Sequence, residues 1–240
     1  MLSFIVPAHN EELWIGKCLD CIRTTIERVG EPYELIVVDD ASTDSTGELA
    51  QKMGARSLRV EHRKISAVRN AGARAARGEV LFFVDADTQV NQLAVRGALA
   101  ALRAGAAGGG CVIGLDGPTP FWARIILFFA VRIARLIQWV GGCFLFCTRE
   151  AYNAAGGFSE SLYAGEDIAF VQALKKVGRF VVLKPTVITS GRKLSVAGPW
   201  QVISLMFRIA IRGARYESKW VLDILYGQRA QDSRRPPNAA

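Results

Sequence analysis

The stretch LFFVDADT (81–88) runs an apolar segment directly into two aspartates separated by one alanine. Such a short apolar run is typical of a strand buried on both faces of a parallel sheet. We expect this strand to cover residues 79–87. Residues i and i+2 of an extended chain point the same way, so Asp85 and Asp87 are expected to face one spot, with Ala86 keeping the backbone approach open.

Two carboxylates held this close repel each other unless a cation offsets their charge. Mg²⁺ and Mn²⁺ prefer oxygen ligands and would leave positions free for phosphate oxygens. The alternative is a turn at the strand end with two solvated acids. The acidic pair alone does not decide between these interpretations.

Outward from this strand, the first half of the chain alternates strand and helix patterns. Strand patterns occupy residues 2–8, 33–40 and 79–87. A first helix pattern follows Asn10, which is expected to cap it, and further helix patterns occupy residues 42–54, 68–78 and 91–105. We expect glycines to close the second and third helices and the glycine-rich segment 105–111 to be a loop. The alternation predicts an α/β fold with a mostly parallel sheet and helices on both faces.

Ligands of such sheets bind at the carboxyl ends of the strands. The segment from Pro7 to Asn10, the pair Asp39 and Asp40, and the pair Asp85 and Asp87 all stand at predicted strand ends. No GxGxxG follows any of these strands, so the usual dinucleotide fingerprint is absent. The sequence therefore predicts a polar site of another kind at this edge.

The charge of the chain indicates an anionic partner. A net charge of +8 and a pI near 9.5 fit a nucleotide phosphate or lipid headgroups. Nucleic acid is not expected, because the chain has no helix-turn-helix, zinc-finger or aromatic RNA-binding signature. Met1 leads directly into the first strand without a signal-peptide pattern, which predicts a cytoplasmic protein.

The cysteines do not indicate a disulfide framework, since the five are odd in number and scattered. Cys18 with Cys21 and Cys143 with Cys147 would make a zinc site if the two pairs came together. Neither pair stands in a glycine-rich knuckle. We therefore favour the interpretation that these side chains act as small hydrophobic residues.

The second half has a different pattern. Residues 121–142 predict an amphipathic helix whose charges interrupt the apolar run too often for a membrane span. Residues 191–228 predict a basic amphipathic helical extension, and residues 229–240 a disordered tail. Packing on the protein's own core and peripheral contact with the inner face of a membrane both fit the amphipathic stretches.

Four motifs agree in order and spacing with one known family. They are IVPAHNEE (5–12), ELIVVDDASTDST (34–46), SAVRNAGARAARGEVLFFVDADT (66–88) and GGFSESLYAGEDIAF (156–170). Together they resemble the family 2 glycosyltransferases, which have the GT-A fold, over roughly residues 3–190. The expected domain is 1–190, with a nucleotide-binding half of about 1–115 and an acceptor half of about 116–190.

The resemblance implies a metal-dependent, inverting enzyme. It would move one sugar from a UDP- or GDP-sugar to a hydroxyl acceptor, a lipid-linked one included, with Mn²⁺ or Mg²⁺ as cofactor. By position in the motifs, the nucleotide pocket is lined by Pro7, Ala8, His9 and Glu11. Asp40 matches the acid that accepts from the base, with Asp39 beside it, and Arg69 matches a contact to the base or diphosphate.

The same resemblance assigns the reacting groups. Asp85 would approach the ribose and the metal, with Ala86 beside it, and Asp87 would bind the metal. Asp167 of the GED motif matches the general base, and Glu166 would orient it or the acceptor. An acid-rich helix start without catalytic meaning is the alternative for this pair.

The chain departs from family patterns in two places. It lacks the late His that serves some GT-A enzymes as a metal ligand, and it lacks the QxxRW of processive synthases, so a single sugar transfer fits better than polymerisation. Arg192 and Lys193 would instead grip the diphosphate, or simply belong to a basic surface. The rival functions are a sugar nucleotidyltransferase, although its glycine-rich loop is missing, and a noncatalytic nucleotide-sugar-binding partner of a membrane synthase.

Overall fold

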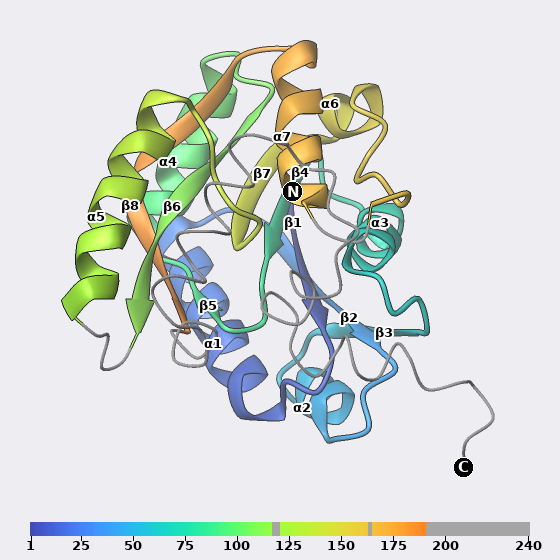
Figure 1. Cartoon of the computed structure of the whole chain (residues 1–240). Coiled ribbons are helices and arrows are strands. Elements are labelled where there is room, and N and C mark those ends of the chain that lie inside the picture. Colours follow the sequence, from blue (N-terminus) through green and yellow to red (C-terminus); the bar gives the residue numbers. More distant parts are fainter. Residues whose placement is uncertain (117–120, 163–164, 191–240) are drawn as a thin grey trace.

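The computed structural model describes residues 1–116, 121–162 and 165–190 (Figure 1). The predicted extension 191–228 and tail 229–240, with Arg192 and Lys193, lie outside the described residues. The strands are β1 (Leu2–Ala8), β2 (Tyr33–Asp40), β3 (Arg56–Val60), β4 (Val80–Val84), β5 (Thr88–Gln89), β6 (Gly108–Asp116), β7 (Phe144–Thr148) and β8 (Phe180–Ser190). The helices are α1 (Glu12–Val29), α2 (Thr46–Lys52), α3 (Ile65–Ala75), α4 (Gln92–Arg103), α5 (Phe121–Leu136), α6 (Arg149–Ala154) and α7 (Glu166–Val177).

The strands form one sheet in the order β3-β2-β1-β4-β7-β6-β8-β5. β1 pairs in parallel with both β2 and β4, and β2 pairs in parallel with β3. β7 runs antiparallel to β4 and β6 on its two sides, whereas β6 and β8 are parallel. The predicted α/β class is confirmed, and the sheet is mixed because β7 runs antiparallel to β4 and β6 and β5 runs antiparallel to β8.

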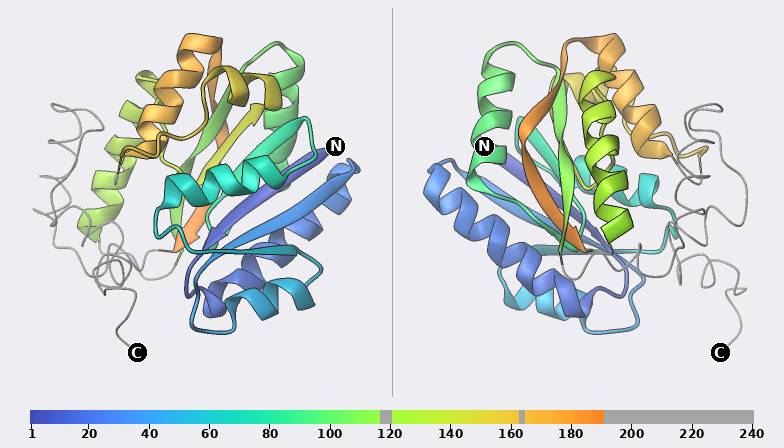
Figure 2. Two further views of the ribbon diagram at one scale, coloured as in Figure 1. Left: turned by 90° about the vertical axis from the view of Figure 1, so that its right-hand side faces the viewer. Right: turned by 60° about the vertical axis from the view of Figure 1, so that its left-hand side comes forward.

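Alternation along the strands sends side chains to two cores. Phe4 and Val6 of β1 join the core covered by α1, α2 and α4, whereas Ile5 between them joins the core covered by α3, α6 and α7. Phe82 and Phe83 of β4 divide in the same way. Figure 2 shows the two helical layers on opposite faces of the sheet. Burial on both faces explains why these strands read as continuous apolar runs.

Several predicted boundaries are wrong. α1 begins at Glu12 and Asn10 does not cap it, because Asn10 has φ 53° and its Oδ1 accepts from the Thr43 amide. α2 begins only at Thr46, since Asp44 forms a turn with the Thr46 amide ahead of it. α3 covers residues 65–75 rather than 68–78 and is closed by extended Ala76, not by a glycine.

The glycine-rich segment was expected to be a loop, but β6 begins at Gly108. The backbone of its neighbours comes too close for a side chain: a Cβ on Gly109 would lie 2.2 Å from the Val181 carbonyl oxygen. Glycine is therefore needed here because the strands approach closely, not because the chain turns. None of the helices in the described ranges is long and apolar enough to span a bilayer.

Candidate active site

The polar segments singled out in the sequence meet at one edge of the sheet. β1, β2 and β4 are parallel, so their carboxyl ends at Ala8, Asp40 and Val84 share that edge. β7 is antiparallel to β4 and pairs Phe144 with Val84, which brings the preceding Gly142 to the same edge. One edge therefore collects residues from three strand ends and one strand start, as expected for a ligand site in an α/β sheet.

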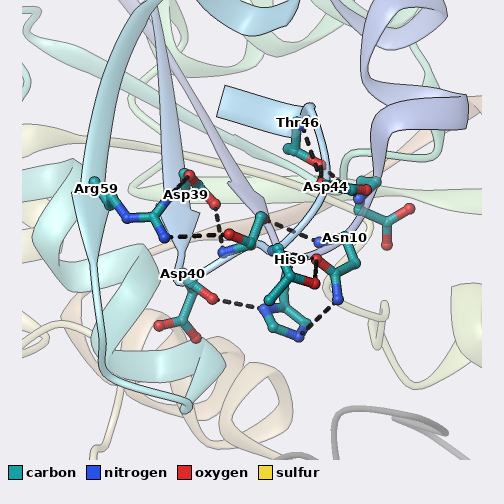
Figure 3. A network of polar contacts seen from close by, with 10 residues as sticks. His9, Asn10, Asp39, Asp40, Asp44, Thr46 and Arg59 are labelled. Carbon is teal, nitrogen blue, oxygen red and sulfur yellow. Dashed lines mark hydrogen bonds and ion pairs between the residues drawn. The ribbon is translucent and has the colours of Figure 1, made fainter. Parts of the chain in front are cut away.

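The first polar cluster joins the ends of β1 and β2 (Figure 3). His9 Nδ1 donates to the Asp40 carbonyl oxygen at 2.6 Å, and the backbone amide of Asn10 donates to Ser42 Oγ at 3.0 Å. The Glu11 amide donates to Thr46 Oγ1 at 2.8 Å. Pro7 and Ala8 are buried and are the last two residues of β1. These contacts lock the loop after β1 onto the loop after β2.

The two acids of the VVDD motif are buried and face different partners. Asp39 accepts from the Ser42 amide at 3.0 Å and from Arg59 Nη1 at 3.2 Å. Asp40 Oδ1 accepts two backbone amides, from His62 at 2.7 Å and Arg63 at 3.0 Å. Asp40 thus fixes the loop after β3, and Asp39 fixes the loop after β2. Their nucleotide contacts stay predictions.

The DAD segment is a turn, not the end of a strand. β4 ends at Val84, and the Thr88 amide donates to the Asp85 carbonyl oxygen at 2.9 Å, which closes a turn over residues 85–88. Asp85 and Asp87 therefore do not lie in an extended chain, and the prediction of a strand over residues 79–87 is wrong at its end. The acids belong to one short turn instead, with buried Ala86 between them.

Each acid of this turn is held by a side chain from elsewhere. Asp85 Oδ1 accepts from Arg69 Nη2 at 2.9 Å, and Asp87 Oδ1 accepts from Thr189 Oγ1 at 3.1 Å. Beneath the turn, Cys18 lies close to both acids. Burial raises the pKa of the Cys18 thiol, and the charges of Asp87 and Asp85 raise it further. Cys18 therefore packs there as a neutral thiol.

Arg69 connects the DAD turn to the GED motif. It is only 2% exposed, and its Nη1 donates to Glu166 Oε1 at 2.9 Å while Nη2 donates to Asp85. Nη2 also lies 3.3 Å from the Gly142 carbonyl oxygen. The guanidinium sits over the Phe158 ring at 5.2 Å. One buried cation therefore bridges two acids that lie 81 positions apart in the chain.

The GED motif opens α7 as predicted. Gly165 stands at the helix N-cap with φ 77°, a conformation that favours glycine, and Glu166 is the first helical residue. Asp167 Oδ2 accepts from the Gly142 amide at 2.8 Å, and Oδ1 accepts from the Ile168 amide at 2.8 Å. Both carboxylate oxygens are thereby fixed, and Gly142 contacts both Arg69 and Asp167.

The surroundings of Asp167 shift its pKa. Burial raises the pKa of Asp167 above the ordinary value of an aspartate, against the opposing effects of Arg69 and of the two amides that donate to it. A carboxylate with a raised pKa accepts a proton more readily at neutral pH. Asp167 is therefore held in one orientation and has a raised pKa, and its role in proton transfer stays a prediction.

The donor set around the DAD turn fits a shared cation rather than an all-protein cage. Within the described ranges, no group of three or more His, Cys, Asp or Glu side chains is arranged to hold a metal ion. Mg²⁺ and Mn²⁺ are commonly held by one or two carboxylates together with phosphate oxygens. Asp87 and Asp85 supply such carboxylates, and Arg69 already offsets part of the charge of Asp85.

Three residues of this site were not predicted from the sequence: Thr189, Gly142 and Arg59. Thr189 reaches Asp87 across 102 positions, so no local pattern could reveal it. Gly142 carries a weak signal, as the second glycine of a GG pair after an amphipathic helix. Arg59 belongs to β3, whose mixed polar pattern was not recognised as a strand.

Comparison with curated proteins finds relatives over part of the chain. The uncharacterised glycosyltransferase EpsJ of Bacillus subtilis is 37% identical over 97 residues, which are 38% of this chain and 27% of that protein. The dolichyl-phosphate beta-glucosyltransferase of Drosophila melanogaster is 40% identical over 99 residues, which are 36% of this chain and 30% of that protein. The matched part thus spans less than a third of either relative.

Solved structures share the fold over nearly the whole chain. S. aureus TarS 1–349 in complex with UDP has a TM-score of 0.63 at 20% identity, covering 93% of this chain and 70% of that one. Mannosyltransferase PcManGT of Pyrobaculum calidifontis, in complex with GDP-Man and Mn²⁺, has a TM-score of 0.64 at 21% identity, covering 95% and 68%. At such identities the likeness establishes the GT-A fold alone.

The family model described as Glycosyl transferase family 2 matches residues 3–152. The match includes the first three motifs with the DAD turn and Arg69, and it ends before Glu166 and Asp167. With the fold shared by the solved glycosyltransferases, these findings confirm the resemblance seen in the sequence, and the chain belongs to glycosyl transferase family 2.

Proposed function

We propose that the chain transfers one sugar from a nucleoside diphosphate sugar to a hydroxyl acceptor, with a divalent cation at the DAD turn and Asp167 as general base. The observation that carries this proposal is the bridge made by Arg69 between Asp85 and Glu166. This bridge brings two groups into one site: the DAD acids, which would hold a cation beside the donor's diphosphate, and the GED motif, whose Asp167 would take the acceptor's proton.

The donor end of the site would be the edge formed by β1 and β2. His9, Asp39 and Asp40 line this edge and are fixed by the hydrogen bonds described above. Structural neighbours were crystallised with UDP and with GDP-Man, so uracil and guanine nucleotides are the first donors to test. The base would lie against the loops that Asp39 and Asp40 hold, and the diphosphate would point toward the DAD turn.

Asp87 and Asp85 would hold the cation, together with oxygens of the diphosphate. When bound, Mn²⁺ or Mg²⁺ supplies positive charge that stabilises the nucleoside diphosphate as it leaves. PcManGT and a second neighbour, glucosyl-3-phosphoglycerate synthase of Mycobacterium tuberculosis, were crystallised with Mn²⁺. Arg69 would support the site by holding Asp85 in place and by offsetting the negative charge of the buried Glu166.

Asp167 would take the proton of the acceptor hydroxyl. The hydroxyl oxygen attacks the anomeric carbon, the bond from that carbon to the diphosphate oxygen breaks, and its electron pair leaves with the nucleoside diphosphate. Attack opposite the leaving group inverts the anomeric configuration. The Gly142 and Ile168 amides hold the carboxylate in one orientation, which a base that acts on a positioned hydroxyl requires.

The acceptor is a hydroxyl compound in this proposal, and lipid-linked hydroxyl compounds are one class to test because the name of the Drosophila relative includes a lipid, dolichyl phosphate. Since the chain spans less than a third of that relative, its name guides the choice of substrates only.

The proposal is tested by measuring donor binding and turnover on the same variants. Thermal unfolding is followed with UDP, GDP, UDP-sugars and GDP-mannose, with and without Mn²⁺, and nucleoside diphosphate release is followed with hydroxyl acceptors. A ligand that binds the native state raises the melting temperature. Asp167→Asn should keep the donor-induced shift and lose release about 100-fold or more, the usual scale of general-base catalysis.

Asp20→Asn is the matched control, because Asp20 lies on the exposed part of α1 and pairs only with Arg23 in the described structure. It should match the wild type in both measurements. Donor binding without any release in the wild type would instead favour a noncatalytic nucleotide-sugar binder. If no nucleotide shifts the melting temperature, the proposed function fails altogether.

A further inference from the structure

Helix α5 carries several large apolar side chains on the outside of the molecule. Ile125, Phe128, Phe129, Ile133 and Leu136 recur at helical spacing and are between 43% and 83% exposed. Ile137, just after the helix, extends this stripe. Figure 1 shows α5 lying along the outer side of β6 and β8. An outward stripe of large apolar residues is unusual on a soluble surface and marks an interaction site.

The orientation of α5 is fixed by its inner face. Val131 and Ala134 pack against the buried core. Arg135 Nη2 donates to the Lys184 carbonyl oxygen at 2.8 Å, and the Val182 amide donates to Gln138 Oε1 at 3.1 Å, so the end of the helix is tied to β8. The helix therefore cannot bury its apolar stripe by rolling inward without breaking these bonds.

Charge identifies what the stripe docks on. The α5 sequence contains no acidic residue and three arginines. Arg132 lies within the stripe, with its guanidinium 5.3 Å from the centre of the Phe128 ring. A long cationic side chain beside exposed aromatic and aliphatic groups suits the interface of a bilayer, where the apolar face enters the acyl boundary and the cation reaches anionic headgroups. We propose that α5 docks this chain on an anionic lipid surface.

Two other occupants fit the charge less well. The segment 198–227 of this chain is also apolar, but between residues 192 and 229 the chain carries seven Lys/Arg against two Asp/Glu. A second copy of the chain would bring the same arginines of α5 to face themselves. Like charges oppose both pairings, whereas an anionic surface attracts α5 and the later basic segment together.

Docking through α5 would place the candidate active site near the surface. Leu136 and Gly142, whose amide binds Asp167, are joined by six residue steps, so they lie within about 20 Å of each other. The docking surface shares no residue with the proposed catalytic machinery. Membrane binding and sugar transfer can therefore succeed or fail separately.

The test is co-sedimentation of the full chain with vesicles of phosphatidylcholine alone, or of phosphatidylcholine and phosphatidylglycerol in equal parts. The wild type should bind the anionic vesicles preferentially, and added salt should weaken the binding. Phe128→Ser with Phe129→Ser should weaken partitioning at least about tenfold, as expected from the loss of two large apolar contacts. Arg132→Gln should weaken it about fivefold, the effect of one basic residue near an anionic surface.

The matched control is Leu13→Ser with Leu93→Ser, two apolar residues on α1 and α4 that are more exposed than Phe128 and Phe129. It should leave vesicle binding unchanged. The proposal is overturned if the wild type stays in the supernatant, or if the control weakens binding as much as the α5 pair. It is also overturned if the α5 double variant lowers the melting temperature as much as a core substitution does, because the stripe would then pack against the chain's own later segment. If the double variant converts a dimer to a monomer, the stripe belongs to an interface with a second copy, and the proposal is likewise overturned.

Discussion

Replacing Arg69 by methionine tests the buried bridge between the DAD turn and α7. Methionine keeps an apolar stem of similar length and can still pack on Phe158, but it removes the charge that both Asp85 and Glu166 contact. Glu166 is 3% exposed and Asp85 is 16% exposed at the side chain, so neither carboxylate is well placed to exchange the lost partner for water. The substitution therefore leaves two carboxylates buried or half-buried without their shared cation.

Removing one partner of a buried ion pair typically costs about 3–5 kcal/mol, because the remaining charge is uncompensated. For a chain of this size 1 kcal/mol lowers the melting temperature by about 2–4 °C, so Arg69→Met should lower it by roughly 6–20 °C. Adding Glu166→Gln to Arg69→Met removes the more deeply buried of the two charges. The double variant should therefore be more stable than Arg69→Met alone by about 1 kcal/mol or more.

The assay is urea unfolding of the wild type, both variants and a control, Arg103→Met. Arg103 pairs with Glu31 at 2.6 Å, but its side chain is 72% exposed, so its removal should cost less than about 1 kcal/mol. If Arg69→Met costs no more than Arg103→Met, or if Glu166→Gln destabilises the Arg69→Met background further, the bridge does not hold the site as described.

Three further predictions concern the same region. Gly142→Ala places a Cβ 2.6 Å from Arg69 Nη2 and should cost about 1–3 kcal/mol in urea unfolding, whereas Gly141→Ala, with no contact closer than 3.9 Å, should cost much less. Asn70→Ala removes the side chain that binds Tyr152 Oη at 2.7 Å and the Phe158 amide at 2.9 Å, and should destabilise the chain by about 2 kcal/mol in the same assay. Because burial raises the pKa of Asp167, the stability that this group contributes is fully present below about pH 4, the unfolded pKa, and is lost as the pH rises through the folded pKa. Asp167→Asn lacks this dependence, so its unfolding free energy relative to the wild type should rise with pH above about 4; a constant difference across that range would contradict the raised pKa.

The sequence predicted the parts of the fold that local patterns encode. β1 and β2 are continuous apolar runs with sharp polar ends, and their predicted bounds match the structure. β7 was not predicted, because FLFCT follows an amphipathic helix pattern and its place is fixed only by pairing with β4 and β6. β3 is short, alternates polar with apolar residues and is partly exposed, so it has no strong apolar signal.

The candidate site was predicted at the level of motifs but not of contacts. The sequence identified the DAD acids and the GED acids, but it predicted an extended chain at the DAD acids where the structure has a turn. Arg69 lies 16 positions from Asp85 and 97 positions from Glu166 in the chain. No spacing rule links an arginine in one helix to a glutamate at the start of another. Tertiary packing decides such contacts, so only the folded chain reveals them.

The proposed cation site at the DAD turn is tested most directly by Mn²⁺ electron paramagnetic resonance, which reports free Mn²⁺ in solution. Mn²⁺ is titrated into the full chain in the presence of UDP or GDP, and into Asp87→Asn and the Asp20→Asn control. We predict that the wild type and the control each bind one Mn²⁺ per chain when the nucleotide that binds is present, after subtraction of the Mn²⁺ that the nucleotide binds alone. Asp87→Asn should bind no Mn²⁺ beyond that background. Equal depletion by wild type and Asp87→Asn would place the cation elsewhere and contradict the account.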